Sequence, residues 1–474
     1  MNYDAVVIGS GPNGLAAGIT LARRGLSVLI AEAKDSVGGG MRSAELTLPG
    51  FVHDVCSAIH ALGAGSSFLK TLPLGRYGLE WITPPSALAH PFEDSAAAVL
   101  DVSTVGTGKT LMEDEISYRK LMNPLVNNWE KLASDILGPL KIPRHLLLSI
   151  GFALLGFQSA EGFSQRHFSG GRSRSFFAGL AAHSMMPLEQ RLTAGVGLVL
   201  GILGHVTGWP FPRGGSQKFA DALAAYFESL GGKIELNRPI NSLADLPAAR
   251  AILFDVTPRQ LLKITGDRFP ARYRRQLENY RYNPGVFKID WALSGPVPFK
   301  AMECRQAGTI HIGGSYDEIA DSERTVWQGK HPERPFVLFA QQSLFDKTRA
   351  PDGKHTGWAY CHVPHGSTED MTAGIEDQIE RFAPGFRDCI LERHTMNTAD
   401  MEAYNANYIG GDINGGVQDW RQLFARPALR SSPYSTPLKG IYICSSSTPP
   451  GGGVHGLCGY HAAGRALRDM FRGE

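Results

Sequence analysis

The sequence predicts an α/β fold in which a parallel sheet near the N-terminus binds a dinucleotide and later segments build a second domain of mixed helices and strands. Two observations support this prediction. A glycine-rich turn lies between a strand-like run and a helical run at the N-terminus, and another lies between such runs near the C-terminus. Because these two units lie at opposite ends of the chain, we expect the first domain to be discontinuous in sequence.

The N-terminal unit begins with Asp4–Ile8 (DAVVI), a short apolar run typical of a buried parallel strand. Gly9, Gly11 and Gly14 follow in the pattern GSGPNG. A helical stretch occupies Leu15–Arg24. This order of strand, GxGxxG turn and helix indicates a Rossmann dinucleotide-binding unit.

Each glycine of this turn has a physical role. Gly9 permits the tight turn, Gly11 lets a pyrophosphate touch the backbone, and Gly14 lets helix and strand pack closely. Pro12 and Asn13 lie between them, at the helix N-terminus whose amides hold phosphates. We therefore expect all five residues to bind the cofactor.

A second strand, Ser27–Ala31, ends at Glu32, which is placed to accept both ribose hydroxyls of an adenosine half. A glycine run with an arginine follows, and it supplies four further expected cofactor contacts: Gly39, Gly40, Met41 and Arg42. An acid followed by such a loop resembles the glutathione-reductase-type flavoproteins. That resemblance implies FAD, with Arg42 near the pyrophosphate or the flavin; a surface arginine is the alternative.

No second strand–GxGxxG–helix unit occurs, and none of the six cysteines forms a CxxC pair. The sequence therefore predicts one bound dinucleotide, FAD, and neither a nicotinamide domain nor a dithiol reductase. A formal net charge of +2 gives no reason to expect nucleic acid as a partner. No cysteine–histidine spacing indicates a metal, so we expect none.

A more specific resemblance begins with Pro49-Gly50-Phe51 and Asp54, a "PGF…D" segment after the glycine–arginine loop. It resembles the phytoene-desaturase and carotenoid-isomerase branch of the amine-oxidase-like FAD-dependent oxidoreductases. The segment FFAGLAAHSMMPL, ending at Leu188, and GWPFPRGGSQKF at 208–219 also look like parts of that branch. The resemblance covers nearly the whole chain, and a sub-branch labelled pyridine-nucleotide-disulfide-oxidoreductase-like is closer still.

The resemblance gives the C-terminal strand–loop–helix a role at the flavin. The strand is expected over Gly440–Ser445, and a glycine-rich loop and a helix over 454–470 follow. Backbone amides at Gly452, Gly453 and Val454 are then expected at the flavin ring. Val454 is expected to open the helix, with the helix dipole favouring a reduced anion.

Ser445 and Ser446 stand where the family commonly has a Gly-Asp pair. The resemblance implies that these serines lie beside the cofactor, although the departure puts the usual ribityl contact in doubt. Three residues are catalytic candidates: His455, His53 and Asp412. Local hydrogen bonding is the alternative for His455, and turn chemistry is the alternative for Asp412.

The domain boundaries follow from these placements. The FAD-binding domain is predicted to contain 1–69, 206–265 and 396–474, and the substrate domain 70–205 and 266–395, with a helical subdomain over about 115–205. Two apolar stretches, Leu146–Ala160 and Ala194–Leu203, are too short to cross a bilayer and are predicted to be buried helices. Peripheral membrane contact is the alternative for a protein otherwise expected in the cytoplasm.

Taken with the resemblance, the sequence predicts an FAD-dependent dehydrogenase or desaturase. It would take a hydride from an apolar or conjugated, isoprenoid-like substrate to flavin N5 and pass electrons to O2 or a quinone. Three alternatives stay open at this point: an amine-type oxidase that uses O2, a redox-neutral isomerase, and a non-catalytic lipid carrier.

Overall fold

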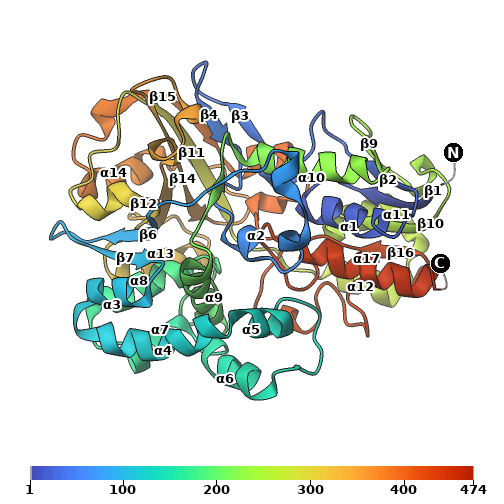
Figure 1. Ribbon diagram of the computed structural model, residues 1–474, viewed down its shortest axis with the longest axis horizontal. Coiled ribbons are helices and arrows are strands. Elements are labelled where there is room, and N and C mark those ends of the chain that lie inside the picture. The colour runs from blue at the N-terminus through green and yellow to red at the C-terminus, as the bar shows by residue number, and fades with distance from the viewer. Residues whose placement is uncertain (1–2, 473–474) are drawn as a thin grey trace.

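Two β-sheets organise the chain, and the computed structural model describes residues 3–472. Figure 1 shows the smaller sheet beside both chain ends, the larger sheet at the opposite end of the molecule, and a group of helices below. The site described below lies where these three parts meet.

The smaller sheet is parallel and has the strand order β16-β10-β1-β2-β9. Its strands are β1 (Tyr3–Ile8), β2 (Val28–Ala31), β9 (Lys233–Glu235), β10 (Ala249–Phe254) and β16 (Ile441–Ile443). They come from three separate parts of the chain, which confirms the predicted discontinuous Rossmann-type domain.

Helices cover both faces of this sheet (Figure 1). On one face lie α1 (Pro12–Ala22), α10 (Ser216–Ser229) and α17 (Leu457–Met470), and on the other lie α11 (Pro258–Thr265) and α12 (Ala271–Glu278). α17 packs directly on α1, because a Cβ on Gly459 would lie 1.8 Å from the Asn13 carbonyl oxygen. On the other face, α12 packs on this sheet as well, although the predicted boundaries gave residues 266–395 to the other domain.

The larger sheet has seven strands in the order β15-β11-β14-β13-β12-β6-β7. They are β6 (Ser86–Pro91), β7 (Ala97–Asp101), β11 (Gly285–Leu293), β12 (Ala307–Ile312), β13 (Val337–Ala340), β14 (His355–Val363) and β15 (Ile390–Met396). One face packs on α14 (Thr372–Phe382). The other turns toward α13 (Tyr316–Trp327) and the helical group.

The helical group lies below the larger sheet in Figure 1. It contains α3 (Thr104–Thr110), α4 (Glu115–Asn127), α5 (Trp129–Ile136), α6 (Leu146–Gly156), α7 (Ala160–His167), α8 (Gly171–Ala182) and α9 (Thr193–Val206). Smaller elements complete the chain: β3 (Ser43–Glu45), β4 (Val52–Asp54), α2 (Ala61–Gly65), β5 (Trp81–Ile82), β8 (Phe211–Pro212), α15 (Thr398–Tyr404) and α16 (Trp420–Leu423).

Only one of the two apolar stretches is a buried helix. α9, which covers the stretch at 194–203, is buried along most of its length. The prediction is wrong for the stretch at 146–160, because α6 buries only one stripe and leaves Leu147 at 86% and Leu154 at 71% exposed. Across residues 3–472, no helix combines the length and apolarity that crossing a membrane requires.

Candidate functional site

One cavity of about 540 Å³ connects the glycine-rich turns of the five-stranded sheet with the polar face of the seven-stranded sheet. Its dinucleotide end is lined by both predicted glycine loops. Its inner end, here called the inner chamber, is lined by Cys56, Ile59, Leu62, His183, Leu200, Trp209, Thr309, Leu338, Trp358, Tyr360 and Ile413. The cavity therefore joins a cofactor-type site to a separate, mostly apolar space.

The GxGxxG turn has the close contacts that its glycines predict. Gly9 has φ +97°, and a Cβ on Gly14 would lie 2.0 Å from the Gly9 carbonyl oxygen. A Cβ on Gly39, in the second loop, would lie 3.0 Å from the Cα of Gly11. The two loops thus touch, and α1 begins at Pro12, after the N-cap Gly11, without a side-chain cap. These residues fit the phosphate-binding cradle of a dinucleotide such as FAD.

Glu32 lies at the end of β2, buried, and lines the cavity. One carboxylate oxygen accepts hydrogen bonds from the Ser10 amide (2.8 Å) and hydroxyl (2.6 Å). The other accepts from the Lys34 amide (3.0 Å) and from Arg42 (3.2 Å). Since a carboxylate offers about four acceptor sites, a ribose bound here would exchange with one of these partners.

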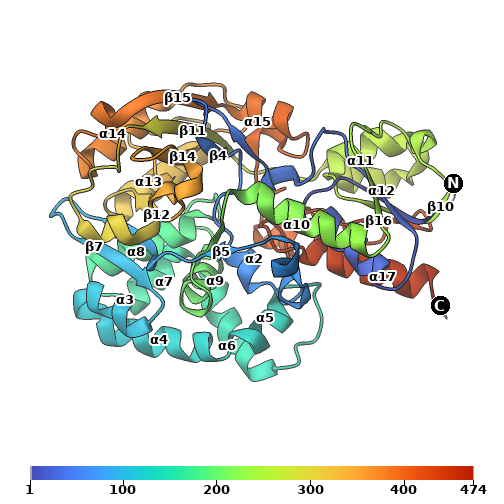
Figure 2. The same ribbon diagram turned by 45° about the horizontal axis from the view of Figure 1, so that its top comes forward.

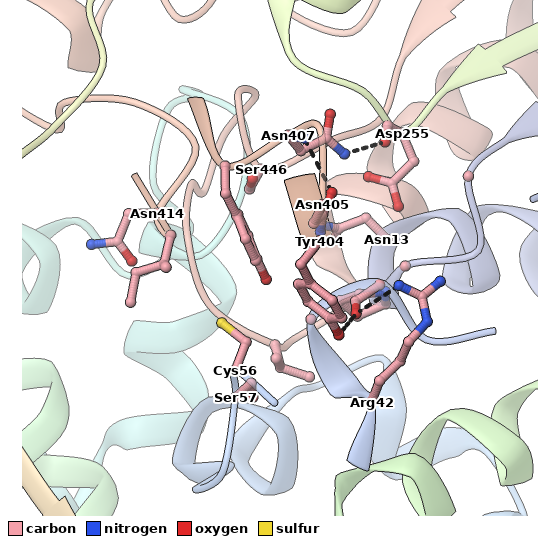
Figure 3. Close-up of a pocket in the computed structure, with 18 of the residues that line it drawn as sticks. Asn13, Arg42, Cys56, Ser57, Asp255, Tyr404, Asn405, Asn407, Asn414 and Ser446 are labelled. Carbon is pink, nitrogen blue, oxygen red and sulfur yellow. Dashed lines mark hydrogen bonds between the residues drawn. The ribbon is translucent and has the colours of Figure 1, made fainter. Parts of the chain in front are cut away.

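Arg42 is buried, which excludes the alternative of a surface arginine. Its guanidinium bonds Glu32 and also donates to the carbonyl oxygens of Ser36 (2.7 Å) and Gly39 (3.3 Å). It therefore fixes the second glycine loop against the end of β2. Its charge lies at the dinucleotide end of the cavity, as Figure 3 shows.

Asp255 follows β10 and was not among the predicted site residues. Its carboxylate accepts a hydrogen bond from the Gly14 amide (2.8 Å), and a Cβ on Gly11 would lie 2.7 Å from the same oxygen. Burial raises the pKa of Asp255 to about 7; the Gly14 amide opposes this rise and the Glu32 carboxylate adds to it. An acid therefore lies at the N-terminus of α1, where phosphate is expected, and it titrates near neutrality.

The segment 403–408, here called the strap, begins in the last turn of α15 and crosses the dinucleotide end of the cavity. The Tyr404 hydroxyl donates to the Gly39 carbonyl (2.7 Å). Asn407 donates to the Asp255 carbonyl (3.1 Å) and accepts from the Thr257 amide (2.9 Å). Figure 3 shows Tyr404, Asn405 and Asn407 to one side of Arg42 and Asp255. The strap thus joins the second glycine loop to the segment that follows β10, from a distant part of the chain.

The C-terminal loop forms another wall, to which Ser446, Gly453 and Val454 contribute. Ser445 and Gly452, which were also predicted, do not line the cavity. The expected helix start at Val454 is wrong, because α17 begins at Leu457 after Gly456, whose φ is +69°. The amides near the cavity therefore belong to a loop and not to a helix end.

A buried arginine, Arg426, holds this wall in place. It donates to the Ser446 carbonyl (2.8 Å) and to the carbonyls of Gly415 (3.0 Å) and Val417 (3.0 Å). Together with the strap and Asp255, it was missed by the sequence prediction. The signal for the strap lay in a run of Tyr and Asn residues, AYNANY at 403–408, just before the GGDINGG loop.

None of the three predicted catalytic residues lines the cavity. His455 uses one ring nitrogen toward the Gly451 carbonyl (3.2 Å) and accepts the Leu457 amide (3.0 Å) on the other. Asp412 accepts three backbone amides, including that of Gly416 (2.6 Å). These contacts favour local structural roles, in which Asp412 shapes the loop whose Asn414 reaches the cavity.

His53 lies next to the cavity wall in a buried charge cluster. Its Nε2 pairs with the Thr47 hydroxyl (2.8 Å), and its Nδ1 is 3.6 Å from Asp290. Burial lowers its pKa to about 4, although Asp290 opposes that shift. Asp290 in turn forms a buried ion pair with Lys288. Neutral His53 therefore supports the cluster from behind the cavity.

The inner chamber carries polar groups that are uncharged. The His183 and His311 Nε2 atoms are 2.9 Å apart, and burial lowers the pKa of His183 to about 3. The Thr309 hydroxyl is buried and has no hydrogen-bond partner. Among the described residues that line this chamber, none is a carboxylate, an ammonium or a guanidinium. Trp358 lines this chamber, whereas Trp291 and Phe339 face away from it.

Comparisons with known proteins agree with this architecture. A family model described as an NAD(P)-binding Rossmann-like domain matches residues 7–71. The pyridine nucleotide-disulfide oxidoreductase domain-containing protein 2 of Mus musculus is 25% identical over 99% of this chain and 94% of its own length. The phytoene desaturase (neurosporene-forming) of Rhodobacter capsulatus is 23% identical over 96% of this chain and 92% of its own length.

The prediction of an FAD-dependent oxidoreductase is confirmed. The resemblance to phytoene desaturases and to the disulfide-oxidoreductase-like sub-branch is confirmed as well. Among solved structures, cyclohexylamine oxidase from Brevibacterium oxydans has the same fold, with a TM-score of 0.61, 16% identity and 100% coverage of both chains. That likeness establishes the fold of this oxidoreductase and nothing about its substrate.

Proposed function

We propose that this oxidoreductase is a dehydrogenase or desaturase that takes a hydride from an uncharged, mainly apolar substrate. The observation that carries the proposal is the cavity of about 540 Å³, which joins the dinucleotide site to an uncharged inner chamber. Burying an unpaired charge costs several kcal/mol, roughly, whereas apolar surface gains from burial. The chamber therefore selects against ionic substrates.

The residues of the chain would supply orientation and a dry environment. FAD, when bound, supplies the hydride acceptor at N5. Leu62, Leu200 and Leu338 exclude water from the chamber, and Trp358 and Tyr360 give it rigid aromatic walls. Orientation of a substrate against the cofactor can contribute roughly 7 to 11 kcal/mol. Loss of the hydride leaves a carbocation, and the neutral imidazole of His183 in the chamber wall would accept the proton that this cation releases. Because such a cation is a strong acid, the arrangement needs no strong base.

The chamber also offers a small number of neutral hydrogen-bonding groups. Thr309 has a buried, unpartnered hydroxyl, and His183 lines the same end of the cavity. An unpartnered buried hydroxyl costs about 1 to 3 kcal/mol, which a substrate oxygen at Thr309 would offset. A mainly apolar molecule with one hydroxyl or carbonyl group fits this lining best. The relatives named as phytoene desaturases support a conjugated, isoprenoid-like molecule.

An amine-type oxidase is the second candidate, because cyclohexylamine oxidase shares the fold. An ammonium in the chamber would face His183, which its low pKa keeps neutral, and would find no carboxylate among the described lining residues. This lining favours the dehydrogenase. The electron acceptor, O2 or a quinone, is part of the same proposal.

The test is the absorbance spectrum of the purified flavoprotein during anaerobic incubation with three substrate classes: polyenes, alcohols and amines. We expect bleaching of the flavin bands by polyenes or apolar alcohols. Bleaching by amines alone, with oxygen uptake when air is admitted, would replace the proposal with the oxidase. A purified protein without flavin absorbance would refute both.

A further inference from the structure

The outer side of α6 and the loop before it form an exposed apolar surface, here called the α6 patch. Its members are Leu140, Ile142, Leu146, Leu147, Ile150, Leu154 and Phe157. Their exposed fractions run from 42% at Phe157 to 88% at Ile142. Large side chains scattered singly over a surface are ordinary, but seven within 18 residues of chain (140–157) form a continuous feature that indicates a partner.

The helical spacing places four of these side chains on one stripe. Leu147, Ile150, Leu154 and Phe157 follow one another at intervals of three and four residues. The opposite stripe, with Phe152 and Gly156, is buried. Gly156 lies against α9, because its Cβ would be 3.4 Å from the Cα of Gly195. The exposed stripe is therefore the side that the fold leaves uncovered, and both ribbon views place α6 at the edge of the molecule (Figures 1 and 2).

The charges around the patch are basic. Lys131, Lys141 and Arg144 are exposed, and Lys141 donates only to a backbone carbonyl, that of Ser134 (2.8 Å). The two acids of the segment 128–158 are already engaged. Glu130 pairs with Lys70 at 2.9 Å, and Asp135 is buried and accepts the amides of residues 144 and 145. An apolar stripe with an uncompensated basic rim complements an anionic lipid surface.

We propose that the α6 patch docks this protein on the surface of a membrane that contains anionic lipids. An 11-residue helix is about 17 Å long, too short to span a bilayer, so it would lie in the interface with its apolar stripe among the acyl chains. α6 packs on α9, whose Leu200 lines the inner chamber. The docking helix thus packs on a helix that contributes to the chamber wall. The docking itself does not depend on the proposed reaction.

The experiment is flotation of the flavin-loaded protein with phosphatidylcholine vesicles, prepared with and without phosphatidylglycerol. We expect flotation with the anionic vesicles, and a loss of at least about tenfold in partitioning for the double variant Leu147→Ser/Leu154→Ser. Partitioning of Lys141→Gln/Arg144→Gln onto anionic vesicles should fall about fivefold per charge removed, and high salt should weaken binding of the wild type. Met302→Ser, which removes a side chain 61% exposed elsewhere, is the matched control and should float like the wild type.

Ile142→Ser provides a second variant outside any helix, so that its effect on flotation cannot come from unfolding of α6. Equal flotation of the wild type and the patch variants, or no flotation at all, would overturn the proposal. A dimeric wild type that becomes monomeric in Leu147→Ser/Leu154→Ser, without vesicle binding, would assign the patch to a second copy of the chain instead.

Discussion

Both faces of the seven-stranded sheet are largely buried, but they differ in the chemistry of their side chains. The face toward α14 shows Ile289, Trp291, Ile310, Phe339 and Cys361, all apolar. The other face, alternating with the first along the same strands, shows Lys288, Asp290, Thr309, His311, Tyr360 and His362. Burial alone therefore does not explain the polar face.

A polar group costs free energy when it is buried without a partner. On the cavity-facing side, Asp290 Oδ1, Thr309 Oγ1, His311 Nδ1 and His362 Nε2 lack hydrogen-bond partners. The apolar face contains the side chains that a stable core needs. One face packs on α14 and builds the core, whereas the other contributes Thr309, Leu338, Trp358 and Tyr360 to the cavity wall. Substitutions on each face test that division.

The buried ion pair on the polar face should give the largest effect. Burial alone would raise the pKa of Asp290, but Lys288, His394 and His53 together hold that pKa below its ordinary value. Asp290→Asn leaves the Lys288 ammonium uncompensated, which should cost about 3 to 5 kcal/mol of unfolding free energy. The double variant Lys288→Met/Asp290→Asn should recover most of it in urea unfolding. A double variant as unstable as the single would contradict the pair's role.

The neighbours Leu338 and Phe339 on β13 point to opposite faces and provide a matched comparison. Phe339→Ala should lower the unfolding free energy by about 3 kcal/mol or more, because it opens a cavity in the core. The KM of the remaining folded enzyme should not change. Leu338→Ala, which borders an existing cavity, should cost less stability and change KM. Equal effects on stability and KM would remove the distinction between the faces.

Asp255 extends the comparison to the other sheet, since it too is a buried polar group beside the cavity. With a pKa of about 7, it is neutral below that pH and repels phosphate above it. We expect the Kd for FAD to rise up to about tenfold per pH unit above pH 7. Asp255→Asn keeps the Gly14 hydrogen bond, so its Kd should not vary between about pH 6 and 8. A pH-independent Kd in the wild type would refute this.

The raised pKa of Asp255 also makes the stability of the cofactor-free protein depend on pH. The unfolded carboxyl ionises from its ordinary value of 3.8, whereas the folded one ionises near 7. The contribution of Asp255 to the unfolding free energy is therefore fully present below about pH 4 and is lost as the pH rises to about 7. Thermal melting of Asp255→Asn beside the wild type should show this loss only in the wild type.

Thr309→Val should have the smallest effect on stability. It exchanges an unpartnered hydroxyl for a methyl group of similar shape, so the unfolding free energy should change by less than about 1 kcal/mol. The variant should lose kcat/KM with substrates that carry an oxygen and keep it with hydrocarbons. The same loss with both classes would show that Thr309 does not recognise a substrate oxygen.

The sequence predicted best where a local pattern determines the structure. The GxGxxG turn, its flanking strands and Glu32 lie within 30 residues, and their glycines make the expected contacts. The polar face was missed although its signal is local, since TIHI at 309–312 and WAYCHV at 358–363 alternate in period two.

The remaining errors depend on tertiary structure. Tyr404 contacts Gly39, and Asp255 contacts Gly14, although hundreds of residues separate each pair along the sequence. An apolar run such as 146–160 does not reveal which of its sides the fold covers. The start of α17 depends on the left-handed backbone at Gly456. Because several glycines precede it in the same loop, the sequence does not show which of them ends the loop.

The most direct test of the cavity-facing side is the rate of anaerobic flavin reduction in Leu338→Trp. The larger side chain should fill the inner chamber without touching the glycine loops. We predict full FAD content, normal bleaching by dithionite, and loss of reduction by the substrate that reduces the wild type. Reduction at the wild-type rate would show that the substrate binds elsewhere.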